Sequence, residues 1–178
     1  RAVIVPILFG KDNEKVLKTA RDLKKKLGDG IEIDDRENYS AGFKFNEWEL
    51  RGIPLRIEIG PLDVEKKSVV FVRRDNGKKE VVKLENVKAR VESVLEEIQN
   101  EMLKKAEKFL EEAIIDVVSM KELKAAIEKK KIAFAPICSS RECEDKLKFE
   151  SGGAKVLNIP EEQPSETGKK RCAICGNK

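Results

Sequence analysis

The chain has 178 residues, enough for one domain or two small ones, and 39% of them are charged, against about 25% in ordinary domains. Its 37 Lys and Arg residues nearly balance its 33 Asp and Glu residues, so a basic surface for a polyanion has to come from local clustering. The sequence lacks His, glycine-rich nucleotide-binding motifs and any run of about 18 apolar residues, which excludes the usual general base, common nucleotide loops and a membrane-spanning helix.

The chain opens with a strand, a helix and a second strand. Residues 2–8 are almost all apolar, as in a strand that is covered on both faces. The helix that follows shows apolar residues at helical spacing and ends at Gly28. Its apolar stripe consists of Val16, Leu17, Ala20, Leu23 and Leu27. With a short strand at residues 31–34, this order predicts a parallel pair joined by a right-handed crossover.

Three further strands are expected in the first half of the chain. Residues 43–51 form a short amphipathic helix that stops at Gly52, and the strand after it alternates apolar and polar residues, which predicts a polar outer face. The last two strands flank Asp75-Asn76-Gly77, a strong hairpin signal. The three strands are residues 54–59, 69–74 and 80–84. We therefore expect an α/β fold, a five-stranded mixed sheet with flanking helices.

The second half begins with a long helix from about Asn86 that can reach Ile115. Its first turns carry apolar residues at helical spacing, whereas the later part is highly charged, as in a solvated arm between two domains. A Ser-x-x-Glu capping box at residues 119–122 opens the next helix. Strands at 132–137 and 154–159, a short helix at 139–148 and a polar loop at 160–170 complete the tail. We expect a first domain at 1–95, a helical connector at 96–118 and a second, small α+β domain at 119–178.

All four cysteines fall in two pairs near the C-terminal end: Cys138 with Cys143, and Cys172 with Cys175. Four thiolates at these spacings can close a tetrahedron around Zn²⁺, and a site without an open position is structural rather than catalytic. Without a secretory context, disulfides are not expected. Two alternatives stay open: four reduced thiols in a core, or redox use of the Cys172–Cys175 pair.

Residues 34–60 gather charges of both signs around the only Trp, Trp48, a mixture that suits base edges as well as phosphates. The alternative is surface ion pairing, for instance between Glu47 and Arg51. Trp48 and Phe43 fit core positions better than base-stacking positions. The basic residues around the hairpin can contact phosphate without reading sequence. They are Arg73, Arg74, Lys78 and Lys79.

The segment GFKFNEWELRGIPLR at residues 42–56, followed by Glu58 and Gly60-Pro61, resembles the anticodon-binding domain of prolyl-tRNA synthetases, which are class II aminoacyl-tRNA synthetases. The resemblance extends over nearly the whole chain, and the cysteine-bearing tail is similar to that of archaeal and eukaryotic-type members. It implies the class II anticodon-binding fold followed by a zinc-binding domain.

The resemblance also implies a function. The chain looks like the C-terminal part of a proline–tRNA ligase, whose catalytic domain, with ATP and Mg²⁺, precedes the anticodon-binding domain, so we expect no catalytic residue here. The implied partner is tRNA-Pro, and the implied full-length protein is a cytoplasmic homodimer without a membrane segment. Another class II synthetase, such as the threonyl or glycyl enzyme, and a non-catalytic tRNA-binding module remain alternatives.

The family's anticodon contacts fall in the region that matches Arg36 to Glu58. The candidates are Glu49 and Arg56 first, then Lys44, Glu47, Arg51, Glu58 and Arg36. The prolyl anticodon ends in two guanines, and an Arg suits guanine O6 and N7 while a carboxylate suits the N1–H and N2 donors. Leu62 stands where some family members carry Lys, which leaves one contact in doubt.

Overall fold

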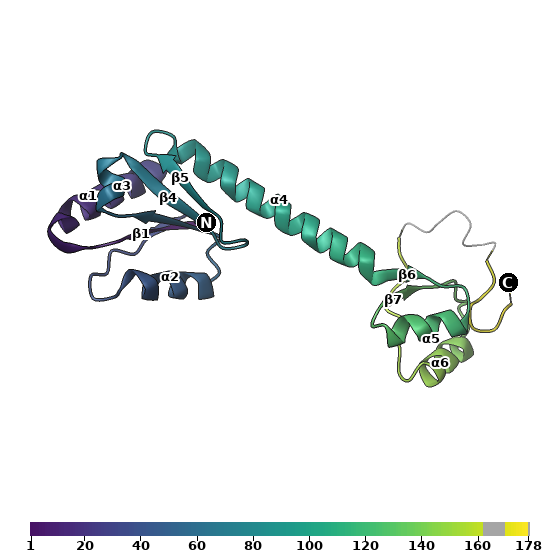
Figure 1. Cartoon of the computed structure of the whole chain (residues 1–178). Helices are drawn as coiled ribbons and strands as arrows, with labels where there is room; N and C mark the ends of the chain where they lie inside the picture. Colours follow the sequence, from purple (N-terminus) through teal and green to yellow (C-terminus); the bar gives the residue numbers. More distant parts are fainter. Residues whose placement is uncertain (162–169, 178) are drawn as a thin grey trace. The chain divides into compact units, whose positions relative to one another are not determined.

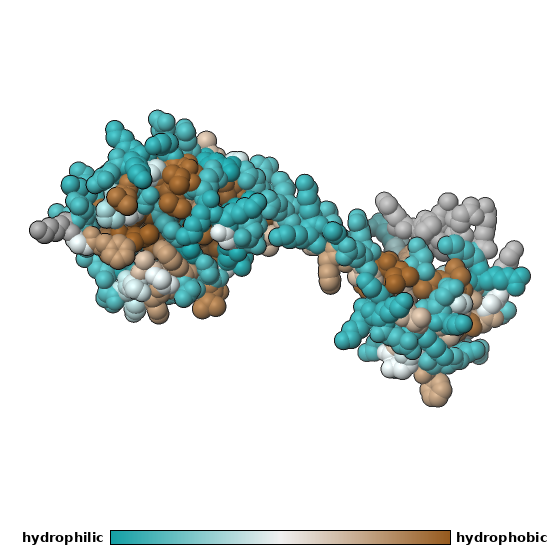
Figure 2. Space-filling view, in the orientation of Figure 1, coloured by the Kyte–Doolittle hydropathy of each residue, from teal (hydrophilic) through white to brown (hydrophobic). Residues whose placement is uncertain are grey.

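The computed structural model describes residues 1–161 and 170–177, and the chain divides into two units, Arg1–Lys104 and Lys105–Lys178. Figure 1 labels the elements of each unit. The surface in Figure 2 is largely hydrophilic, as the charged composition predicts, with apolar areas on both units. Most of the polar loop expected at residues 160–170 lies outside the described residues.

A mixed five-stranded sheet forms the centre of the first unit, as the sequence predicts. Its strand order is β2-β1-β3-β4-β5. The strands are β1 (Ala2–Pro6), β2 (Ile31–Ile33), β3 (Leu55–Ile59), β4 (Ser68–Arg73) and β5 (Lys79–Lys83). β1 pairs in parallel with β2 and β3, whereas β3–β4 and β4–β5 are antiparallel. The inner strand β1 is buried along its whole length, which explains its nearly continuous apolar sequence.

Two long helices, α1 (Asn13–Leu27) and α4 (Val87–Ala113), cover one face of the sheet (Figure 1). The core there combines alternate residues of the strands with the apolar stripes of both helices. It includes Ile4, Leu55, Ile57, Phe71, Val16, Ala20, Val91 and Val94. Two short helices are not predicted from the sequence. They are η1 (Gly10–Asp12), between β1 and α1, and α3 (Pro61–Glu65), between β3 and β4.

The opposite face of the sheet carries α2 (Ala41–Leu50), which Figure 1 shows on the other side from α1 and α4. The Ser40 hydroxyl caps α2 by accepting a hydrogen bond from the Phe43 N–H at 3.3 Å. The prediction that the polar face of β3 is exposed is therefore wrong, because the side chains of Arg56 and Glu58 are only 11% and 8% exposed. Strand alternation separates two faces, but it does not reveal that a helix covers the polar one.

The β4–β5 hairpin turns at the predicted Asn-Gly. Gly77 has a φ of 70°, in the left-handed region that favours glycine, and its N–H donates to the Arg73 carbonyl at 2.9 Å. The Asn76 side chain accepts from the Lys78 N–H at 2.9 Å, which holds the turn locally. The hairpin prediction is confirmed.

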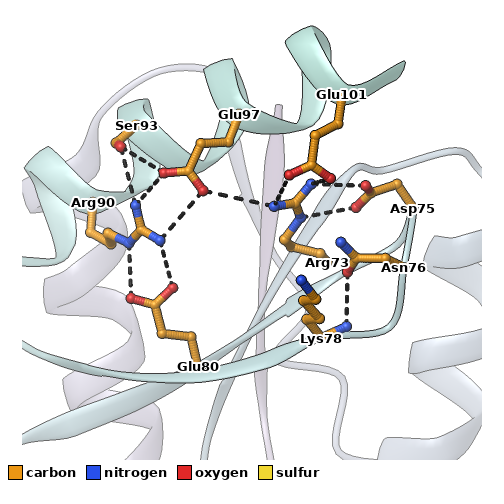
Figure 3. Close-up of polar contacts among 9 residues, drawn as sticks. All are labelled: Arg73, Asp75, Asn76, Lys78, Glu80, Arg90, Ser93, Glu97 and Glu101. Atoms are coloured by element: carbon orange, nitrogen blue, oxygen red, sulfur yellow. Dashed lines mark hydrogen bonds and ion pairs between the residues drawn. The ribbon is translucent and has the colours of Figure 1, made fainter. Parts of the chain in front are cut away.

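Two arginines tie this hairpin to α4 (Figure 3). Arg73 donates 2.8 Å hydrogen bonds to Asp75 and Glu101, and Arg90 donates to Glu80 at 2.8 Å and to Glu97 at 2.6 Å. Glu97 also lies 3.7 Å from Arg73, so the two groups of ions join. The Arg73 side chain is engaged and 10% exposed, which does not fit the expected phosphate contact at this position.

We expect Arg73→Met to lower the free energy of unfolding of the first unit by about 2 kcal/mol, because it removes charge-assisted hydrogen bonds from a largely buried position. The matched variant Arg90→Met removes a similar set of bonds from a side chain that is 31% exposed, and should cost less than about 1 kcal/mol. Urea unfolding followed by Trp48 fluorescence measures both. An equal loss of unfolding free energy in the two variants would contradict the claim that burial makes the Arg73 hydrogen bonds more stabilising.

The second unit contains a two-stranded parallel sheet, β6 (Ile114–Asp116) and β7 (Ile132–Phe134), with α5 (Met120–Glu128) and α6 (Arg141–Glu150). The predicted capping box is present: the Ser119 hydroxyl accepts from the Glu122 N–H at 3.3 Å. The Glu122 carboxylate reaches back to the Val118 N–H at 2.8 Å. α4 ends at Ala113, slightly before the expected limit, because the next residues pair with β7.

The strand expected at residues 154–159 is wrong, since the structure shows no strand there. Within the described residues β7 pairs only with β6, and residues 154–160 instead line an apolar cavity of about 430 Å³ together with α5 and β7. A run of β-branched and apolar residues favours an extended chain, but a strand also needs a neighbour to pair with. Among the described residues, no helix is both long and apolar enough to cross a membrane.

Candidate nucleic-acid interface and metal centre

The buried carboxylate of Asp34, just after β2, organises the layer between α2 and the sheet. It accepts hydrogen bonds at 2.8 Å from Nε and Nη2 of Arg36 and at 2.8 Å from Nε1 of Trp48. Burial by itself raises the pKa of Asp34, but the hydrogen bonds from Arg36 and Trp48 outweigh burial and lower the pKa to about 2. Asp34 is therefore charged at neutral pH and fixes the orientation of α2.

Lys44 lies in the same layer and is only 1% exposed. Its Nζ donates to the Asp34 carbonyl oxygen at 3.2 Å. Burial lowers the pKa of Lys44, while the negative charge of Asp34 acts against that shift. Of the candidate anticodon contacts, Lys44 is thus the most deeply buried, and Glu58 is buried as well.

Glu47 links two arginines on the surface above this layer. Its carboxylate accepts hydrogen bonds from Arg36 and from Arg51, and the hydrogen bond from Arg36 is the main cause that lowers the pKa of Glu47. The Arg51 guanidinium also lies 4.8 Å from the centre of the Trp48 ring. The structure thus brings Arg36, Glu47 and Arg51 together as one group.

Arg56 forms a second group with Glu49 and Glu58. Its Nη1 donates to Glu49 and its Nε donates to Glu58 at 3.0 Å, while its guanidinium lies 4.1 Å from the centre of the Phe45 ring. Lys79 stands 3.8 Å from the other oxygen of Glu58. Glu58 and Phe45 hold Arg56 from below, and Glu49, at 48% exposure, presents the carboxylate that solvent or a ligand can reach.

Two aromatic residues and one arginine differ from the sequence interpretation. Phe43, expected in the core, is 50% exposed, so that prediction is wrong. The Arg56 guanidinium stacks on the ring of Phe45, which is not among the site residues expected from the sequence. The spacing could have indicated it, because Phe45 lies four residues before Glu49 and the two are therefore neighbours on the helix. Arg74 lines a small hollow with Glu49 and Arg56, so it belongs to this group of charges rather than to a separate loop.

The four cysteines of the second unit converge. Cys138 follows β7, Cys143 lies in the first turn of α6, and Cys172 and Cys175 lie in the C-terminal turn. All four sulfurs lie within 4.8 Å of one another, with Cys138 and Cys143 3.4 Å apart. These separations are too long for a disulfide of about 2 Å, and they are close to the roughly 3.8 Å between sulfurs of a tetrahedral site with 2.3 Å metal–sulfur bonds. The four residues are close enough to hold one metal ion.

Backbone N–H groups point at one of these sulfurs. Cys172 Sγ accepts from the Cys138 N–H and from the Ile174 N–H, each at 3.4 Å. Burial raises the pKa of Cys172, but the backbone N–H groups outweigh it and lower the pKa to about 6. Cys172 therefore favours the thiolate, which is the form of cysteine that binds metals, whereas the hydrogen bond with Cys138 and burial raise the pKa of Cys143 to about 12.

The mixed sheet of the first unit lies in the part of the chain that matches an anticodon-binding domain, and the four-cysteine unit lies in the part that matches a C-terminal domain of prolyl-tRNA synthetases. A family model described as "Anticodon binding domain" matches residues 1–94, and one described as "Prolyl-tRNA synthetase, C-terminal" matches residues 120–178. The chain belongs to the prolyl-tRNA synthetase family, of which it represents the C-terminal part.

Known proline–tRNA ligases are similar to this chain over nearly all of its length. It is 41% identical to the proline–tRNA ligase of Alkaliphilus oremlandii and 41% identical to that of Natranaerobius thermophilus, over 99% and 98% of its length. It spans 36% of the length of each of these relatives. The crystal structure of prolyl-tRNA synthetase from Cryptosporidium parvum superposes with a TM-score of 0.87 at 36% identity, covering 99% of this chain and 37% of that one.

Proposed function

We propose that this chain recognises the anticodon of tRNA-Pro, as the C-terminal part of a cytoplasmic, homodimeric enzyme that attaches proline to that tRNA with ATP and Mg²⁺. The family match and the relatives' names support the enzyme class. One structural observation carries the anticodon role: Arg56 is held between Glu49, Glu58 and the Phe45 ring, which orients a guanidinium and a carboxylate side by side.

The chemistry of guanine fits this pair. A guanidinium has five N–H donors, so Arg56 has donors beyond those used on Glu49 and Glu58, and these suit the O6 and N7 acceptors of guanine. The exposed Glu49 carboxylate suits the N1–H and N2 donors on the other edge. Both contacts require bases that are splayed out of a loop, as anticodon bases are. In this proposal Glu58 positions Arg56, and the group of Arg36, Glu47 and Arg51 flanks the site.

The cysteine site is proposed to hold Zn²⁺. Four thiolates are the ligand set of structural zinc sites, and they leave no position for a substrate. The backbone N–H groups at Cys172 support the same assignment, because they stabilise a charged sulfur before a metal arrives. In this role zinc holds the second unit together and takes no part in aminoacylation.

Arg56→Ala in the full-length protein is expected to lower kcat/KM for charging tRNA-Pro with proline about 5- to 150-fold, the equivalent of about 1–3 kcal/mol for one bidentate base contact. The loss should shrink greatly on a tRNA whose anticodon guanines have been replaced, because the contact is then already absent. The measurement is the four-way comparison of both proteins with both tRNAs.

Lys78→Ala is the control. Lys78 is exposed at the hairpin, and a phosphate contact there should weaken all tRNAs about equally and reduce the salt dependence. Strictly additive effects of Arg56→Ala and the anticodon changes would mean that Arg56 does not touch these bases. Charging with another amino acid would overturn the enzyme assignment itself.

A further inference from the structure

Two exposed aromatic rings stack on one another at the start of α2. Tyr39 precedes the capping residue Ser40, and Phe43 lies in the first turn. Their ring centres are 4.7 Å apart and their planes differ by 14°. The Arg36 guanidinium lies 4.7 Å from the centre of the Tyr39 ring. Tyr39 is 40% exposed and Phe43 is 50% exposed, so a flat aromatic surface remains open to solvent.

The needs of the fold do not account for this exposure. Neither ring belongs to the buried core of the first unit. The helix end is already capped by the Ser40 hydroxyl. A hydrophobic contact across the helix start fixes the entry of the chain, but that role is met by the touching faces of the two rings and leaves the outer surface unused. Trp48 on the same helix, by contrast, is hydrogen-bonded to Asp34 and covered by Arg51.

The charges nearby indicate which part of a nucleotide fits. Arg36, the nearest cation, is already paired with Asp34 and Glu47, and Asp35 pairs with Arg21. The surroundings are therefore close to neutral and offer little to a phosphate. A flat π surface next to a guanidinium instead suits the face of an unpaired base, which proteins commonly hold by stacking on aromatic side chains.

The position on α2 connects the rings to the proposed anticodon site. Phe43, Asn46 and Glu49 are exposed and follow one another at three-residue spacing, so they share one side of the helix. Six residues of helix separate Phe43 from Glu49 by about 9 Å along the axis. A single strand that places a guanine at Glu49 and Arg56 can therefore continue along the exposed side of α2 toward the rings.

We propose that the Tyr39–Phe43 stack binds one further unpaired base of the same tRNA loop, by stacking and without preference for its identity. The proposal rests on the proposed anticodon function and adds a second subsite to it, formed by residues that have no part in reading guanine.

The test measures the affinity of the chain for an anticodon stem-loop RNA of tRNA-Pro. Phe43→Leu keeps an apolar contact with Tyr39 but removes the ring, and should weaken binding about tenfold, within the range of one base–aromatic stack. Tyr39→Phe keeps both rings and should bind like the wild type. The loss should be unchanged from low to high salt. It should vanish on an RNA that lacks the base at one loop position next to the guanines, whichever base that position normally carries.

Arg56→Ala, measured beside these variants, separates the two proposals. If Arg56→Ala weakens binding and Phe43→Leu does not, the stacking subsite is overturned and the anticodon function stands. If neither variant weakens binding, both are overturned. Phe43→Leu could instead weaken binding to every RNA that lacks a single loop base, or lower the melting temperature of the first unit. Either result would assign Phe43 a structural role and overturn the subsite.

Discussion

Removal of the metal from the four-cysteine site is expected to unfold the second unit from about residue 132 onward while the first unit stays folded. Cys143 and Cys172 belong to the small buried cluster of that unit, so the metal ligands and the core are the same structure. Structural zinc supplies on the order of 10 kcal/mol of binding energy to small domains, and that energy is also folding energy. The first unit has a separate core and does not depend on it.

Two readouts separate the units. Trp48, the only Trp, lies in the first unit, so its fluorescence should not change on chelation, whereas amide hydrogen exchange in α6 and β7 should rise steeply. Cys172→Ser should raise amide hydrogen exchange in the second unit as the chelator does, and adding the chelator to this variant should not raise it further. Metal analysis should give one Zn²⁺ per chain. Protein purified without chelators that contains no zinc and has four reactive thiols would contradict the assignment.

Asp34→Asn is expected to lower the free energy of unfolding of the first unit by roughly 3 kcal/mol at pH 7, because it leaves the buried ammonium of Lys44 without its nearest negative charge. It also weakens the hydrogen bonds from Arg36 and Trp48. Asp35→Asn is the matched control. Asp35 is 37% exposed and paired with Arg21, and its loss should cost less than about 1 kcal/mol.

The effect of Asp34→Asn should depend on pH. The pKa of Asp34 is lowered from 3.8 to about 2 on folding, so its charge stabilises the folded state fully above pH 4. This stabilisation is lost as the pH falls from about 4 through 2, because the folded state must then take up the proton that the unfolded state already holds. Urea unfolding at pH 7, 4 and 3 should show the difference between the wild type and Asp34→Asn narrow only below pH 4. A constant difference would contradict the role of the charge.

Local signals predicted the fold of the first unit well. The Asn-Gly turn, the apolar run of β1 and the stripe of α1 each depend on residues close in sequence, and each is confirmed. The strand prediction at residues 154–159 is wrong because a strand needs a neighbouring strand to pair with, and the local sequence does not specify that neighbour. The same holds for the position of α2, because its packing against β1 and its contact with Arg56 of β3 are tertiary and are not specified by its own sequence.

The candidate site shows a similar division. The sequence identified the charged residues of 34–60, yet it did not separate those that face solvent from those that support them. Lys44 and Glu49 stand on one short helix and look equally polar in the sequence, but one is buried and the other is half exposed. The ammonium of Lys44 is turned inward to donate to the carbonyl of Asp34, a contact between α2 and the end of β2 that the helix sequence alone does not reveal.

If Arg56 and Glu49 read the anticodon guanines as proposed, their pairing in the free protein affects the discrimination against other bases. Glu49 is paired with Arg56, whereas Arg56 is also paired with Glu58, so a base that draws Arg56 away leaves the Glu49 carboxylate without this partner. Guanine offers acceptors on one edge and donors on the next, and it can replace both halves of the pair. An adenine or a pyrimidine with an incomplete set of edges would meet an energetic penalty rather than a mere absence of attraction. In the proposed site, the Arg56–Glu49 ion pair of the free protein therefore competes with the base, and guanine is the base that can replace both of its contacts.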